Sequence, residues 1–149
     1  MTKDKREEAL LLDHQLCFPL YAAARYVTGS YASFLKPLGL TYTQYLVFLV
    51  LWEEDEIPVG RLSERLFLDT GTLTPVLKKL EKKGYITRTR SSEDERVVLI
   101  KLTRDGQALK KKVLDVPGQV SRCCKGLTAD EVETLYGLLY KLLKGEMGS

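Results

Sequence analysis

The stretch that decides the fold is LDTGTLTPVLKKLEKKGYITRTRSSEDERVVLIKLT, Leu68 to Thr103. Its first part predicts a helix over about Thr72 to Lys83, because apolar residues recur on one helical face and polar residues occupy the others. Gly84 follows as a C-terminal cap. The residues of the apolar face, which we assign to the core, are Leu73, Val76, Leu77 and Leu80.

The second part of the stretch predicts a β-hairpin. Tyr85 to Arg90 alternates in the manner of a strand, Ser91 to Glu95 is a polar turn, and Arg96 to Leu102 is apolar and β-branched. Upstream, Gly60 to Phe67 predicts a short helix, followed by a turn at Leu68 to Gly71. Two short helices, a tight turn and a basic hairpin together predict a winged helix-turn-helix.

The residues on either side predict more helices. A long helix is expected from about Asp13 to Leu35, with its regular part beginning near Phe18 because Pro19 is tolerated only in a first turn. Thr41 is expected to cap a buried helix, Tyr42 to Glu54, in which Trp52 is a core residue.

Two helices are expected after the hairpin. One is capped by Thr103 and runs from Arg104 to about Val116, where Pro117 and Gly118 interrupt it. The other is capped by Thr128 and covers Ala129 to about Lys144. The fold class is therefore mainly α, in one domain spanning residues 1–149.

Charge points to a function because it is concentrated. The net charge is only +3, but the segment from Thr70 to Arg104 holds nine basic and four acidic residues. Such a segment is typical of a surface that binds phosphates. No apolar run reaches membrane-spanning length, and the N-terminus lacks the apolar centre of a secretory signal, so a cytoplasmic protein with no membrane partner is expected. Three cysteines and one histidine fall short of a zinc set, so no metal or cofactor is expected.

On these residues the chain resembles the MarR-type transcriptional regulators. The wing piece DERVVLIKLT is the most specific part of the match, and LDHQLCFPLYAAAR with LTYTQYLVFLVLWE resembles the organic hydroperoxide-sensing OhrR branch. The resemblance implies a homodimer built by residues 1–40 and 104–149, with residues 41–103 as the winged-helix DNA-binding region. The implied partner is near-palindromic operator DNA.

The resemblance also assigns residues by position. The residues that match the recognition helix are Thr70, Thr72, Thr74, Lys78 and Lys79. Those that match the wing are Arg88, Arg90, Asp94 and Arg96, and the resemblance implies that the aspartate orients the arginine. The implied function is repression until an organic hydroperoxide oxidises the early cysteine, and the protein is not expected to be an enzyme.

The early cysteine is Cys17. A free cysteine is commonly a small buried hydrophobe, and reaction with peroxide needs a thiolate, which a helix N-terminus or nearby donors favour. Tyr21 lies one helical turn away on the same chain. The resemblance adds Tyr31 and Tyr42, for which packing in the core is the alternative. Because 14 helical residues span about 21 Å, Tyr31 can reach a thiol only on the partner chain.

Cys123 and Cys124 match the two-cysteine type of the branch, in which a distal thiol of the other subunit condenses with the oxidised cysteine. Either could serve, simple burial of both is the alternative, and low-molecular-weight thiols are further candidates. Two other functions compete: a regulator that binds a small aromatic ligand without redox chemistry, and a thiol peroxidase.

Overall fold

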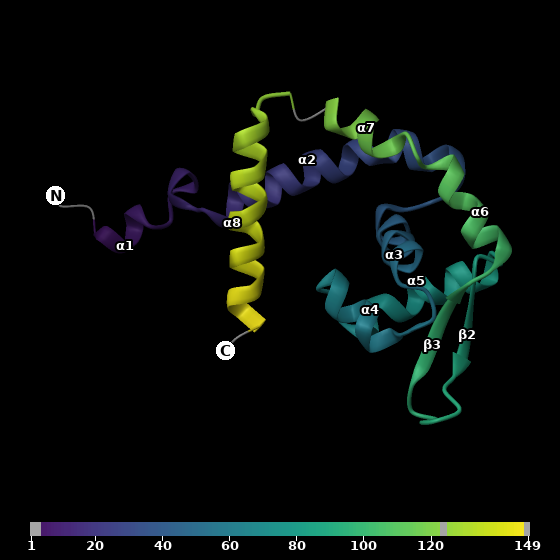
Figure 1. Ribbon diagram of the computed structural model, residues 1–149. Coiled ribbons are helices and arrows are strands. Elements are labelled where there is room, and N and C mark those ends of the chain that lie inside the picture. Colours follow the sequence, from purple (N-terminus) through teal and green to yellow (C-terminus); the bar gives the residue numbers. More distant parts are fainter. Residues whose placement is uncertain (1–3, 123–124, 148–149) are drawn as a thin grey trace.

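The computed structural model describes residues 4–122 and 125–147 and has the predicted class: mainly helical, with a small sheet (Figure 1). The helices and strands in chain order are α1 (Lys5–Glu8), η1 (Leu12–His14), α2 (Cys17–Leu35), η2 (Lys36–Leu38), α3 (Tyr42–Glu53), β1 (Ile57–Pro58), α4 (Val59–Leu66), α5 (Thr70–Lys82), β2 (Ile86–Arg90), β3 (Val98–Leu102), α6 (Arg104–Lys112), α7 (Val116–Ser121) and α8 (Ala129–Met147).

The centre of the fold is α3, which begins and packs as its sequence predicts. Thr41 accepts a hydrogen bond from the Gln44 amide at 3.2 Å, and the Gln44 side chain accepts one from the Thr41 amide at 3.1 Å, forming a capping box. α3 packs against α2, α4, α5 and α6. The fully buried side chains that surround it come from most of the chain and include Leu35, Phe48, Leu51, Leu62, Leu73, Leu77, Leu80, Ile86 and Ile100.

The sheet has three antiparallel strands in the order β1-β3-β2. β2 and β3 form the predicted hairpin, with Ile86 opposite Leu102 and Arg90 opposite Val98, and its tip projects away from the helices (Figure 1). The two-residue strand β1 joins this hairpin to the helix-turn-helix, because Ile57 pairs with Ile100. The Asp55 carboxylate strengthens the joint by accepting a hydrogen bond from the Leu102 amide at 2.9 Å.

Prolines lie in the first turns of two helices. The long N-terminal helix begins at Cys17, beside Phe18 where its regular part was expected, and Asp13 lies before it in η1. The helix after the hairpin ends at Lys112 and not near Val116, and Pro117 lies in α7 where it was expected to interrupt a helix. Both helix starts have one cause: proline lacks an amide hydrogen, which the first turn of a helix does not need. Pro19 and Pro117 each lie in such a first turn.

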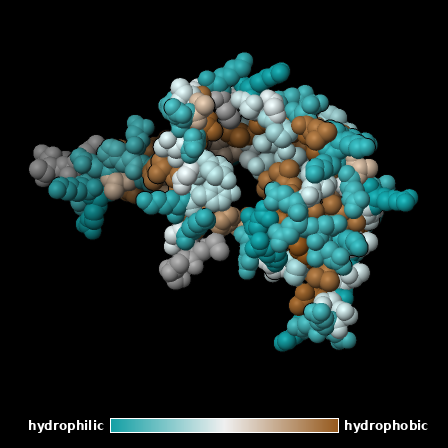
Figure 2. Space-filling model, viewed as in Figure 1, coloured by the Kyte–Doolittle hydropathy of each residue, from teal (hydrophilic) through white to brown (hydrophobic). Residues whose placement is uncertain are grey.

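The outer helices form an arc around the winged-helix unit. α2 and α7 pack together across the top of the molecule, and α8 descends on the far side from the hairpin (Figure 1). Much of the apolar surface of α2 and α8 is exposed, including Phe18, Tyr21, Leu138 and Leu142. The space-filling view shows a hollow between α8 and the winged-helix unit, with apolar side chains on its rim (Figure 2).

Among the helices that the structure describes, none alone is long and apolar enough to cross a membrane. The segment formed by residues 17–38 and α3 meet that test only as a pair, and they are bent by 79°.

Candidate DNA interface and thiol site

The helix α5 presents a polar face outside a buried apolar one. Its N-cap is Asp69, whose carboxylate accepts a hydrogen bond from the Thr72 amide at 2.6 Å. This bond is the main reason why the pKa of Asp69 lies below its usual value. Leu73, Leu77 and Leu80 are fully buried, whereas the predicted contact residues Thr70, Thr72, Lys78 and Lys79 are exposed. A helix of this kind can enter a major groove with its first turns toward the bases.

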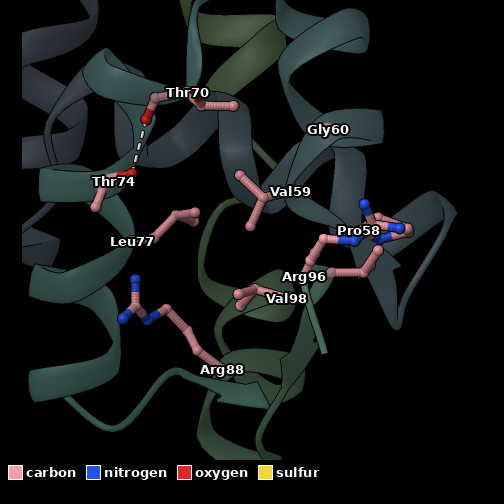
Figure 3. Close-up of a pocket in the computed structure, with 10 residues that line it drawn as sticks. Pro58, Val59, Gly60, Thr70, Thr74, Leu77, Arg88, Arg96 and Val98 are labelled. Carbon is pink, nitrogen blue, oxygen red and sulfur yellow. Dashed lines mark hydrogen bonds between the residues drawn. The ribbon is translucent and has the colours of Figure 1, made fainter. Parts of the chain in front are cut away.

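Thr74 lies differently from the other threonines of α5. It is half-buried, and its hydroxyl donates to the Thr70 carbonyl at 2.7 Å (Figure 3). The next residue, Pro75, lies inside the helix and cannot donate to the carbonyl four residues earlier. Pro75 is visible in the sequence, but the helical periodicity that predicts α5 does not indicate a proline inside the helix.

The tip of the hairpin holds a charged pair. The Arg96 Nε lies 3.2 Å from Asp94 Oδ1, and the Arg96 amide donates to the same oxygen at 3.0 Å. The Arg96 side chain is 91% exposed, so Asp94 orients a guanidinium that otherwise extends into solvent. Hydrogen bonds from the side chain and then from the backbone of Arg96 lower the pKa of Asp94. The pairing that the sequence allowed is therefore present.

The two arginines of β2 make different contacts, although their spacing places both on one face of the strand. Arg90 donates to the Glu95 carbonyl at 2.7 Å and holds the turn of the hairpin. Arg88 extends from the hairpin toward α5, where its Nε lies 3.6 Å from Glu81 Oε1 (Figure 3). Sequence spacing did not indicate the Glu81 contact, because it joins two elements.

Arg88 enters a cleft between α5 and the wing. The cleft has a volume of about 490 Å³, and Thr70, Thr74 and Arg96 also line it. Arg96 lies on the other side of the cleft from Arg88, near Pro58 (Figure 3). The Arg88 Nε is buried, and among the described residues it makes no hydrogen bond, its contact with Glu81 being an ion pair. Two guanidinium groups, each paired with a carboxylate, therefore lie beside the first turns of α5.

The thiol of Cys17 is free and exposed at the first residue of α2. The positive end of a helix dipole attracts negative charge at this position. Tyr21 is 60% exposed, and the Arg25 guanidinium lies over its ring at 5.3 Å from the centroid. His14 is engaged elsewhere, since its Nδ1 lies 2.8 Å from the Glu8 carbonyl oxygen.

Tyr31 and Tyr42 are brought together, as part of a cluster of three tyrosines. Their ring centroids lie 4.8 Å apart, and Tyr45 completes the cluster at 5.6 Å from Tyr31 and 6.4 Å from Tyr42. Burial first, and then the neighbouring Tyr31, raise the pKa of Tyr42. Tyr45 was missed, although its i+3 spacing from Tyr42 is visible in the sequence.

The tyrosine cluster belongs to the far end of α2 from the thiol. Tyr31 follows Cys17 by 14 residues on one continuous helix, which corresponds to about 21 Å. One chain therefore supplies Cys17 with Tyr21 as a close sequence neighbour, and places Tyr31 and Tyr42 elsewhere. The two other predicted thiols, Cys123 and Cys124, lie outside the described residues.

The chain is similar to known transcriptional regulators. Residues 30–113 match the family model described as transcriptional regulator SarA/Rot. The chain is 45% identical over 141 residues to the organic hydroperoxide resistance transcriptional regulator of Bacillus subtilis, covering 95% of each protein.

Solved structures have the same architecture. Reduced AbfR bound to DNA is 37% identical with a TM-score of 0.77, and the match covers 95% of this chain and 99% of that one. Wild-type MarR of E. coli is 32% identical with a TM-score of 0.69, and the match covers 87% of this chain and 97% of that one.

Proposed function

The chain belongs to the SarA/Rot family of transcriptional regulators, winged-helix proteins of the MarR type, and we propose that it represses transcription until organic hydroperoxides oxidise Cys17. The observation that carries the proposal is the free, exposed thiol at the first residue of α2. It stands in a chain with 45% identity, over almost its whole length, to a regulator of organic hydroperoxide resistance.

The DNA-binding part of the proposal uses α5 and the wing. The first turns of α5 enter the major groove with Thr70 and Thr72 toward base edges, while Lys78 and Lys79 approach phosphates. Arg96, oriented by Asp94, contacts the neighbouring backbone or minor groove from the tip of the hairpin.

A dimer completes both the DNA contacts and the thiol site. The exposed apolar residues of α2 and α8 supply a surface that a second copy would bury. Two winged-helix units related by a twofold axis bind a near-palindrome with half-sites about one helical turn apart, or ~34 Å. In this dimer the partner's Tyr31 and Tyr42 hydroxyls hydrogen-bond the Cys17 thiolate and stabilise its charge.

The chemistry at Cys17 needs only the hydroperoxide and one further thiol. The thiolate attacks the terminal oxygen of the hydroperoxide, the O–O bond breaks, and the leaving alkoxide takes a proton to become an alcohol. The resulting sulfenic acid condenses with a second thiol, with loss of water, to form a disulfide. The second thiol is Cys123 or Cys124 of the partner subunit, or a low-molecular-weight thiol.

A gel-shift titration tests sensing and DNA binding together. The probe is a duplex selected from random sequence by the reduced wild-type protein, and cumene hydroperoxide is the oxidant. We expect wild type to release the duplex on oxidation and Cys17→Ser to retain it. Release from Cys17→Ser would contradict the assignment of the thiol. Failure of wild type to select any duplex would contradict DNA recognition.

The second thiol is tested by mass mapping of the oxidised protein. A Cys17 linkage to Cys123 or Cys124 across subunits is expected, and Cys123→Ser and Cys124→Ser should separate the two. A mixed disulfide with a small thiol at Cys17 alone would exclude both distal cysteines. As a sensor and not an enzyme, the protein should consume hydroperoxide in proportion to its thiols, without sustained turnover.

One observation favours a second function, regulation by a small apolar ligand. A cavity of about 510 Å³ lies between α2 and α8, and apolar side chains such as Leu20, Val27 and Leu139 line it. A ligand there would release DNA equally well from wild type and from Cys17→Ser. The same titration with a small aromatic acid in place of the hydroperoxide separates the two functions.

A further inference from the structure

The C-terminal helix α8 touches the DNA-binding unit at the turn of the helix-turn-helix. The Tyr140 ring on α8 meets the Phe67 ring edge-on, with centroids 6.3 Å apart and an interplanar angle of 67°. Phe67 follows the last residue of α4 and stands two residues before Asp69, the N-cap of α5. The lower end of α8 accordingly lies beside α4 in the ribbon view (Figure 1).

Phe67 has a backbone conformation that its side chain disfavours. Its φ of 52° and ψ of 38° lie in the left-handed region, which glycine adopts at helix ends without steric penalty. The turn is nevertheless closed by the hydrogen bond from the Leu68 amide to the Ser63 carbonyl at 3.2 Å. Phenylalanine at this place strains the backbone but provides a ring, and that ring is what Tyr140 contacts.

The Tyr140 ring is held in place by its own helix. Tyr136 packs on it with ring centroids 4.7 Å apart, and the Lys144 ammonium lies 6.0 Å from its centroid. A side-chain hydrogen bond between the two tyrosines is the first cause of the raised pKa of Tyr140. The Tyr140 ring is therefore expected to move together with α8.

A cavity that α8 shares with α2 lies near the thiol in the sequence of α2. Leu135 and Leu139 share a cavity with Leu16, Pro19 and Leu20, the residues that surround Cys17 in the sequence. One helix thus faces the start of α2 on one side and the turn before α5 on another.

We propose that Phe67 and Tyr140 are positioning residues that fix the recognition helix relative to α8 and so set the spacing of the two recognition helices in the dimer. The inference rests on the proposed function and deepens it, because it identifies how a shift of α8 reaches the DNA-binding surface. Neither residue touches DNA. Their effect is on how strictly the dimer discriminates between operators whose half-sites are differently spaced.

A double-mutant cycle tests the contact itself. Phe67→Leu, Tyr140→Leu and the double variant are compared with Phe67→Tyr and Tyr140→Phe, which keep both rings. The readout is the equilibrium constant of unfolding in a denaturant titration. An edge-to-face aromatic pair predicts a coupling of roughly two- to twelvefold between the two leucine substitutions. Independent effects that simply multiply would overturn the proposal.

Half-site spacing tests the positioning role. The duplex is lengthened by one base pair at its centre, and a scrambled duplex measures non-specific binding. Wild type and the ring-keeping variants should discriminate sharply against the longer duplex, whereas Tyr140→Leu should lose most of that discrimination at unchanged non-specific affinity. Equal discrimination by Tyr140→Leu and wild type would contradict the proposal.

Phe67→Gly keeps the test decisive if Phe67→Leu does not fold, because glycine takes the left-handed conformation freely while removing the ring. It should behave like Tyr140→Leu in the spacing assay. Strict discrimination by a folded, dimeric Phe67→Gly would overturn the proposal. A wild-type protein that selects no duplex would instead contradict the proposed function.

Discussion

Gly106 is the residue at which a single methyl group should do most damage to the joint between the winged-helix unit and α6. A Cβ built at Gly106 would lie 2.2 Å from the Tyr85 carbonyl oxygen, a backbone atom, and 3.0 Å from Leu102 Cδ2. The Gly106 carbonyl also accepts the indole N–H of Trp52 at 3.0 Å. In Gly106→Ala the first turn of α6 must therefore move away from Tyr85 and from α3 together.

The magnitude follows from three contributions. Forcing an extra methyl group into a packed site costs about 1–3 kcal/mol. Loss of the Trp52 hydrogen bond adds about 1 kcal/mol. Alanine returns about 0.5–1 kcal/mol through its better helix propensity. The net loss is about 2 kcal/mol, which lowers the midpoint of thermal unfolding by about 4–8 °C for a chain of this size.

Thermal unfolding followed by circular dichroism measures this loss, and Trp52, the single tryptophan, reports the joint by fluorescence. Gly60→Ala is the matched control, because a Cβ at Gly60 meets nothing within 4 Å. The control should unfold no earlier than wild type. A Gly106→Ala protein with an unchanged midpoint and unchanged Trp52 emission would refute the close approach of α6 to the Tyr85 carbonyl.

Three further predictions concern the wing and the helix caps. Arg96→Ala should weaken operator binding and reduce the slope of log affinity against log salt by about 0.9 if one phosphate contact is lost; Asp94→Asn should weaken binding less, at nearly unchanged slope, because the arginine remains but is no longer held. Thr41→Ala should lower the free energy of unfolding by about 1 kcal/mol in a denaturant titration, because it removes half of a capping box. The pKa of Asp69 is lowered in the folded protein, so its cap stabilises above the unfolded pKa, and the stability difference between wild type and Asp69→Ala should shrink as pH falls below about 4.

The elements that sequence predicts well are those whose pattern is local. The α5 helix runs from Thr70 to Lys82, close to the expected Thr72 to Lys83, because its apolar periodicity and its cap lie within one stretch. The hairpin was predicted for the same reason, because apolar and polar residues alternate along its strands and its turn is polar. Thr41, Thr103 and Thr128 all accept the capping hydrogen bonds expected of them.

What sequence does not predict is contact between distant segments. A two-residue strand such as β1 has no pattern of its own and exists only because β3 pairs with it. Trp52 was assigned to the core, yet its indole also donates to a carbonyl 54 residues away. The ion pair of Arg88 with Glu81 and the contact of Phe67 with Tyr140 have the same origin. Each of these contacts joins two separate elements of the fold.

Contacts between distant segments also determine how a thiol can control DNA binding from a distance. Cys17 begins α2 and Tyr31 lies near the other end of the same helix, so a thiol site made from both requires two chains. Oxidation in such a site changes the relation between the chains, and a dimer on a palindrome is sensitive to that relation through the spacing of its recognition helices. The winged-helix unit can then move as a rigid body together with α6, because Asp55 and β1 tie its sheet to its helices and Trp52 ties it to α6. Under the proposed function, release of DNA therefore requires a shift of α2 and α8 against this unit and no change within α5 itself.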